Sequence, residues 1–159
     1  MNPRIEYIQE KKLIGKRLTM SLINNRTGEL WKSFGPRLKE IENRVNTDRI
    51  SMQVYGDSFS VKSNNSNGEF EKWATVEVEN FENLPKDLEK FILNGGQYAV
   101  FDYKGLSTDP SIFKYIFTVW LPNSEYKLEN RPHFEVLGEK YKNNDPNSEE
   151  EIWIPIGKK

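Results

Sequence analysis

The chain contains two copies of one structural unit, and this duplication constrains its fold more than any other feature. Each copy has the predicted order strand–helix–strand–strand, and the second copy follows the first after about eighty residues. The copies span about residues 1–82 and about residues 95–157. The sequence between them has no flexible linker, so we expect one domain over residues 1–159. Helices that cover one face of a mostly antiparallel sheet make this an α+β fold.

Alternating apolar residues predict the strands of both copies. They lie at 5–22, 50–54 and 74–78 in the first copy, and at 98–103, 134–136 and 152–156 in the second. Asparagine-rich segments at 64–68 and 143–148 predict the loops between the last two strands of each copy. Residues 84–93 connect the copies, and we expect a short helix there.

The helix of the first copy is predicted from apolar residues that recur at steps of three and four. They are Leu30, Phe34, Leu38, Ile41 and Val45. Gly35 and Pro36 interrupt this pattern, because a proline inside a helix removes a hydrogen bond and clashes with the preceding turn. We expect either a kink there or a short turn with the main helix beginning at Pro36. In the second copy, Asp109 and Pro110 mark the start of the helix, and Pro122 marks its end.

The composition excludes several kinds of site. The chain has no cysteine, which excludes disulfides, thiolate metal sites and cysteine nucleophiles. It has one histidine, His133, so a metal site with several histidines is impossible, and we expect neither metal nor cofactor. The net charge is −1 and the basic residues do not cluster, which argues against direct nucleic-acid binding. The sequence shows no signal peptide and no apolar run of membrane length, so we expect a cytoplasmic protein.

One face of the sheet is expected to carry aromatic and acidic residues. If the aliphatic rows of four strands meet the helices, the alternate residues lie on the opposite face. The aliphatic rows are Ile50/Met52/Val54, Ala74/Val76/Val78, Phe134/Val136 and Ile152/Ile154/Ile156. The opposite face then carries Gln53, Tyr55, Trp73, Thr75, Glu77, His133, Glu135, Leu137, Glu151 and Trp153. Such a face is typical of a binding surface; the alternative is that a connection of the chain or a partner subunit covers it.

The final strand favours a cationic or amphipathic aromatic ligand. Glu151 and Trp153 point to the same side, away from the three isoleucines of this strand. A cation over an indole gains roughly 0.5–1 kcal/mol when exposed and about 2 kcal/mol when desolvated. A buried carboxylate without a partner is costly, and a bound cation would satisfy it. The alternative is a half-exposed strand with an ordinary surface glutamate.

Three segments resemble the GyrI-like small-molecule-binding superfamily, which includes effector-binding domains of AraC-type and multidrug-sensing bacterial transcription regulators. They are LWKSFGPR at 30–37, the segment 115–126 with VWLPNS at its centre, and the pair HFEV at 133–136 and EIWIPI at 151–156. The resemblance implies a cleft at the pseudo-twofold axis that binds hydrophobic, often cationic, compounds. No helix-turn-helix segment precedes the first strand, so we expect a stand-alone member.

The resemblance also implies which residues contact the ligand. Glu151 matches the glutamate of the family's final strand, and Glu135 matches a second carboxylate. Trp153 stands where the family pattern commonly has tyrosine. The aromatic residues carried over by position and strand parity are Tyr55, Trp73, Phe101 and Trp120. Trp31 and Phe34 either line the cleft or belong to the core.

Three functions are compatible with these residues. The first is binding without turnover, in which the protein senses or sequesters a hydrophobic or cationic compound; it needs no catalytic residue, and we favour it. The second is hydrolysis of reactive cyclopropane-bearing compounds, which is associated with some stand-alone relatives; Glu151 or Glu135 would then act as general base. The third is interaction with DNA gyrase, which certain relatives inhibit or protect, or with a separate regulator. The locally acidic segment 149–151 would carry it.

Overall fold

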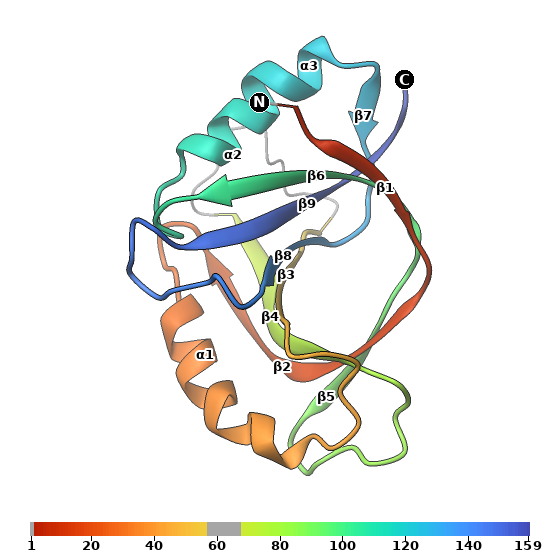
Figure 1. Cartoon of the computed structure of the whole chain (residues 1–159), viewed down its shortest axis with the longest axis vertical. Coiled ribbons are helices and arrows are strands. Elements are labelled where there is room, and N and C mark those ends of the chain that lie inside the picture. The colour runs from red at the N-terminus through yellow and green to blue at the C-terminus, as the bar shows by residue number, and fades with distance from the viewer. Residues whose placement is uncertain (1, 57–67) are drawn as a thin grey trace.

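The computed structural model describes residues 2–56 and 68–159 (Figure 1). Its first half contains β1 (Arg4–Ile8), β2 (Lys11–Ser21), α1 (Thr27–Phe34), the 3₁₀ helix η1 (Gly35–Glu40), β3 (Arg49–Val54) and β4 (Glu69–Val78). The second half contains β5 (Glu89–Leu93), β6 (Gly96–Lys104), α2 (Ser111–Tyr115), the π-helical turn η2 (Ile116–Trp120), α3 (Leu121–Asn123), β7 (Tyr126–Leu128), β8 (His133–Leu137) and β9 (Glu149–Lys158).

Within the described residues, the strands form one nine-stranded antiparallel sheet with the order β1-β6-β9-β8-β3-β4-β2-β5, and β7 pairs with β9. This order is symmetric about the β8–β3 pair, because β9 and β6 follow β8 as β4 and β2 follow β3. The two helical segments cover one face of the sheet, and β8 and β3 lie between them (Figure 1). The predicted α+β fold is therefore confirmed.

The helix of the first copy ends at the proline instead of beginning there. Helix α1 stops at Phe34, and a short 3₁₀ helix follows that contains Pro36 near its start. Proline lacks the N–H that a continuing α-helix requires, and it is tolerated in the first turn of a new helical segment. The expected helical row to Val45 is wrong, because Ile41 is already extended and Val45 is exposed.

The other predicted elements agree with the structure except in three places. The segment 5–22 holds two strands instead of one, because β1 pairs with β6 whereas β2 pairs with β4 and β5. Residues 84–93 hold strand β5 instead of a helix, because Phe91 and Leu93 alternate with polar residues and β5 pairs with β2. Strand β7 was not predicted. The predicted loop at 143–148 is confirmed, whereas the one at 64–68 lies almost wholly outside the described residues. The second helix begins at Ser111, one residue later than predicted, and Asp109 Oδ1 accepts a hydrogen bond of 2.9 Å from the Ser111 amide. Its helical path continues through η2 and α3, so Pro122 lies inside α3 instead of ending the helix.

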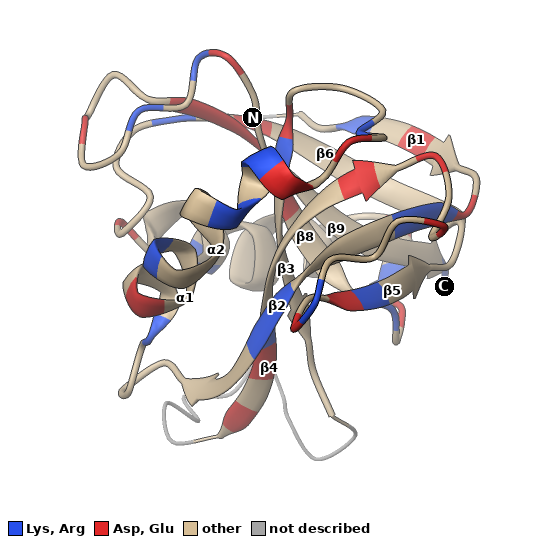
Figure 2. Ribbon diagram, turned by 90° about the horizontal axis from the view of Figure 1, so that it is seen from below, with Lys and Arg blue, Asp and Glu red and all other residues tan. Residues whose placement is uncertain are grey.

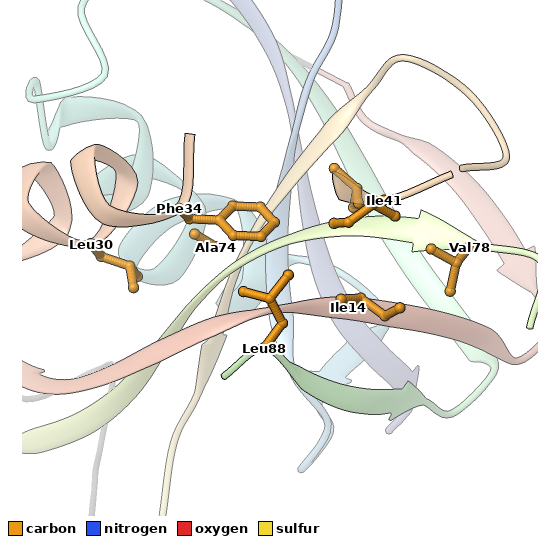
Figure 3. Close-up of a cluster of buried hydrophobic side chains, with 8 residues drawn as sticks. Ile14, Leu30, Phe34, Ile41, Ala74, Val78 and Leu88 are labelled. Atoms are coloured by element: carbon orange, nitrogen blue, oxygen red, sulfur yellow. The ribbon is translucent and has the colours of Figure 1, made fainter. Parts of the chain in front are cut away.

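Each helix covers an aliphatic core that belongs to its own half. Under α1, Leu30 and Phe34 pack against apolar side chains of β2 and β4 (Figure 3). Under α2 and η2, Ile112 and Ile116 pack against β6 and β9. Phe34 is fully buried, which places it in the core, while Trp31 is partly buried beside it.

A third core fills the opposite side of the sheet and overturns the predicted assignment of faces. Paired residues share a face, and Met52 pairs with both Trp73 and Phe134. The aliphatic rows of β3 and β8 therefore point away from the helices, together with Trp73 and Trp153. The core consists of Leu13, Ile50, Met52, Trp73, Leu93, Tyr98 and Phe134. Since these residues come from both ends of the strand order, the sheet curls around them. This face is therefore covered by the sheet itself, and not by a connection or a partner subunit as the predicted alternative had it.

Lysine and arginine are interspersed with aspartate and glutamate along the strands and loops of the ribbon in Figure 2. None of the helices in the described part of the chain is long and apolar enough to cross a membrane.

Candidate polar site between the two helical segments

The helix face of the central strands carries a polar cluster between the two aliphatic cores. Lys72, Gln53 and His133 lie side by side on β4, β3 and β8, because Gln53 pairs with both of the others. In the next row along the strands, Ser51 pairs with Glu135. Lys72, Gln53, His133 and Ser51 are all buried. Buried polar groups are normally hydrogen-bonded, so the partners of this cluster indicate what it can bind.

Glu135 is the anionic centre of the polar cluster. Its two carboxylate oxygens accept hydrogen bonds of 3.1 and 3.0 Å from Gln53 Nε2. The ammonium of Lys72 lies 3.9 Å from Glu135 Oε1, which is the outer limit of an ion pair. The amide oxygen of Gln53 is buried and has no hydrogen-bond partner among the described residues. The cluster thus offers one unused acceptor beside a carboxylate.

Aromatic rings enclose His133 at one side of the cluster. The ring of Tyr55 meets the imidazole edge-on with a centroid distance of 4.8 Å, and Phe117 lies at 6.0 Å. Phe117 comes from the π-helical turn η2, a kind of helical irregularity that is frequent at functional sites. Burial lowers the pKa of His133 to about 3, so its imidazole is neutral at physiological pH. His133 therefore contributes an aromatic surface and no charge.

Glu150 is a second carboxyl group near Glu135. It lies on the same face of β9 as Ile152, and Ile152 pairs with Glu135, so the two glutamates are diagonal neighbours. Burial raises the pKa of Glu150 to about 7, to which the charge of Glu135 contributes, while Lys72 opposes the shift. No ion pair of Glu150 is found within residues 2–56 and 68–159.

Glu150 also lines a surface depression of about 560 Å³ at the ends of β6, β8 and β9. The acidic residues that line it are Asp48, Asp102, Glu139, Glu149, Glu150 and Glu151. Two lysines, Lys104 and Lys140, lie at the same depression. Its volume falls within the usual range of small-molecule sites. Glu135 and Gln53 do not line it, so Glu150 is the residue that links the depression to the buried polar cluster.

The structure divides the predicted ligand-binding residues among three places. Tyr55 and Glu135 belong to the polar cluster on the helix face. Trp73, Glu151 and Trp153 lie on the opposite side of the sheet, so the predicted set does not share one face. Phe101 and Trp120 pack edge-on at 5.2 Å in the core beneath α2.

Glu151 and Trp153 already satisfy each other on their side of the sheet. The Trp153 indole N–H donates to Glu151 Oε1 at 3.1 Å, and Arg4 donates to Glu151 Oε2 at 2.9 Å. The Trp153 ring stacks on Phe134 with a centroid distance of 5.2 Å. A carboxylate with an arginine and an indole as partners has less need of a cationic ligand than Glu150 has.

Sequence reasoning missed three members of the site, namely Ser51, Lys72 and Glu150. Lys72 extends the row Ala74, Val76 and Val78 by one step, and Glu150 extends the row of the β9 isoleucines in the same way. A charged residue that continues an aliphatic row toward the strand end was the available signal. The prediction overlooked it because it looked for polar residues only on the alternate positions.

Comparison with known proteins supports a ligand-binding domain. Residues 1–157 match the GyrI-like small molecule binding domain. The chain is 28% identical over 160 residues to the transcriptional regulator BrlR of Pseudomonas aeruginosa, in a match that covers 98% of the chain and 56% of BrlR. The chain thus spans about half the length of this curated relative.

Two solved structures share the fold. The C-terminal domain of EcmrR superimposes with a TM-score of 0.72 at 14% identity, and the match covers 98% of this chain and 97% of that domain. The structure of SAV2435 bound to tetraphenylphosphonium superimposes with a TM-score of 0.66 at 16% identity, covering 99% of this chain and 94% of SAV2435. Together with the match over nearly the whole sequence, the fold places this chain in the GyrI-like small-molecule-binding family.

Proposed function

We propose that this protein binds hydrophobic aromatic cations without turning them over, and that it senses or sequesters such compounds. The observation that carries the proposal is Glu150, a largely buried carboxyl group in the wall of an acidic depression beside a second carboxylate, Glu135. An ionised carboxylate in this position is costly when the site is empty. A bound cation would remove that cost, so the site favours positively charged ligands over neutral ones.

The surroundings supply the hydrophobic part of such a ligand's contacts. Tyr55 and Phe117 both contact the neutral ring of His133, which lies on the same face of β8 as Glu135. SAV2435, which has the same fold, was solved with tetraphenylphosphonium, a cation whose charge is surrounded by four aromatic rings. This compound is therefore the natural first probe for the present protein.

Replacing Glu150 by glutamine is expected to weaken the binding of tetraphenylphosphonium at pH 8 by about tenfold, because the variant loses one nearby countercharge. Binding of neutral triphenylphosphine oxide should change little. Isothermal titration calorimetry of both compounds against both proteins measures the difference. Glu125→Gln is the matched control: it removes the same charge from an exposed position that does not line the depression. Equal losses in the two variants would contradict the assignment of Glu150.

The affinity for the cation is also expected to rise with pH. The proton on Glu150 competes with the ligand, and the pKa of this group is about 7. Below that value, each pH unit should weaken cation binding by up to about tenfold, and above it the affinity should level off. Titrations between pH 5.5 and pH 8.5, chosen as about one and a half units either side of the pKa, test this. A Glu150→Gln protein that retains the same pH dependence would exclude Glu150 as its source.

Hydrolysis is the second candidate function, and the same residue favours it. A carboxyl group with a pKa of about 7 is suited to act as general acid or base at neutral pH. Incubation with a cyclopropane-bearing alkylating compound, followed by mass spectrometry of the products, separates turnover from binding. Turnover that disappears in Glu150→Gln would establish the enzyme, whereas recovery of the intact compound would leave binding as the function.

A further inference from the structure

We propose that Lys72 is a built-in counter-ion that limits this site to singly charged cations. The inference rests on the proposed function and specifies the charge of the ligand. Lys72 lies on the helix face of β4, where it pairs with Gln53 on one side and with Leu18 on the other. Its side chain is 8% exposed, and its ammonium lies 3.9 Å from Glu135. A buried lysine beside a cation-binding site lowers the affinity for the ligand by charge repulsion, so its presence calls for a specific role.

The charge balance of the site explains the role of Lys72. With both glutamates ionised, Glu135 and Glu150 carry two negative charges, and Lys72 neutralises one of them. His133 is neutral. Of these charges, one negative charge therefore remains for the ligand. The other carboxylates that line the depression are at least partly exposed, so water screens their charges, and Glu151 is paired with Arg4. A monocation makes the site neutral, whereas a dication would leave an uncompensated positive charge in a desolvated place.

The other cationic side chains near the site do not neutralise the two glutamates. Arg49 lies on the same face of β3, but its guanidinium is sandwiched by the rings of Trp31 and Tyr141, at 5.8 and 5.6 Å from their centroids. Lys104 and Lys140 line the depression and are exposed, so water screens their charges. Lys72 is thus the buried cation nearest to Glu135 among the described residues.

Two aromatic cations of similar size and shape test the proposal. Methylphenylpyridinium carries one positive charge, and methyl viologen carries two on nearly the same skeleton. The wild-type protein is expected to prefer methylphenylpyridinium. In Lys72→Met, which keeps an unbranched side chain one atom shorter, the affinity for methyl viologen should rise by about tenfold more than that for methylphenylpyridinium.

Three further variants make the result specific. Lys90→Met removes the same charge from an exposed position on β5 and should leave the preference unchanged. Glu135→Gln should weaken both cations, and the double variant Lys72→Met/Glu135→Gln restores the net charge of the site and should return the preference to that of wild type. Lys72→Gln replaces Lys72→Met if thermal melting shows that the methionine variant does not fold.

The outcomes separate this inference from the proposed function. If wild type binds either cation and Lys72→Met shifts the preference toward the dication, the counter-ion role is supported. If wild type binds but the preference is the same in Lys72→Met and Lys90→Met, the counter-ion role is overturned while the proposed function stands. If wild type binds neither methylphenylpyridinium, methyl viologen nor tetraphenylphosphonium at pH 8, both fall.

Discussion

Replacing Gly15 by alanine is expected to lower the free energy of unfolding by about 3 kcal/mol, at the upper end of the cost of overpacking. A Cβ atom at this position would lie 1.9 Å from the backbone oxygen of Ala74 and 2.9 Å from the Cα of Thr75. Both atoms belong to the backbone of β4, so no side-chain rotation relieves the contact. Strand β2 pairs with β4 from Lys12 to Ser21, and β4 cannot retreat without loss of that ladder.

Urea denaturation followed by circular dichroism measures this effect. Gly28→Ala is the matched control, because Gly28 lies in α1 and a Cβ there meets nothing within 4 Å. The control should be neutral or more stable by up to about 1 kcal/mol, since alanine favours the helix over glycine. If Gly15→Ala unfolds at the same urea concentration as wild type, the close approach of β4 to β2 is wrong.

The stability of the protein is expected to depend on pH through two groups of the polar site that act in opposite directions. His133 has a pKa of about 3 in the folded protein against 6.5 in the unfolded chain. The unfolded chain therefore binds an extra proton between these values, and the histidine makes folding less favourable as the pH falls below 6.5. The change amounts to about 1.4 kcal/mol per pH unit.

Glu150 has the reverse effect. Its pKa is about 7 in the folded protein against 4.5 in the unfolded chain. The folded protein holds the extra proton in that window, so this glutamate makes folding less favourable as the pH rises from 4.5 to 7. Between about pH 4.5 and 6.5 the two contributions cancel, and wild type should show little net dependence on pH from this pair.

Two single variants separate the contributions of His133 and Glu150 to the pH dependence of stability. In Glu150→Gln only the histidine remains, and stability should fall toward acid by about 1.4 kcal/mol per pH unit. In His133→Phe, which keeps a ring against Tyr55 and Phe117, only the glutamate remains, and stability should rise toward acid by a similar amount. Other titrating groups affect all variants alike, so urea midpoints at pH 5 and pH 6.5, both chosen inside the shared window, isolate the pair. Parallel behaviour of wild type and His133→Phe would show that the histidine is not buried in its neutral form.

Periodicity predicted most of the helices and strands in their order because it reports local geometry. The alternation in 98–103 and 152–156 corresponds to β6 and β9, and the step of four from Leu30 to Phe34 corresponds to α1. The α-helix stopped at Phe34 because Pro36 lacks the N–H that a continuing α-helix requires. Residues 84–93 formed β5 because pairing with β2 outweighed a short local pattern.

The candidate site was less accessible to sequence reasoning. Alternation shows which residues of a strand share a face, but it does not show which face meets the helices when both faces are buried. In β4 and β9 the aliphatic rows lie under the helices, as predicted. In β3 and β8 the aliphatic rows lie on the other side, in the third core, which leaves Gln53 and Glu135 on the helix face.

By itself, the sequence determined the duplicated α+β architecture, the family and the presence of acidic and aromatic residues on its strands. Each of these depends only on local periodicity and on the types of the residues. Only the tertiary structure decided which carboxylates stand together. The curl of the sheet creates a core on the face that would otherwise be open, and it pairs Glu151 with Arg4 there. The same curl leaves Glu135, Glu150 and Lys72 between the helices. Because they are buried there, the charge of each one affects the protonation or pairing of the others.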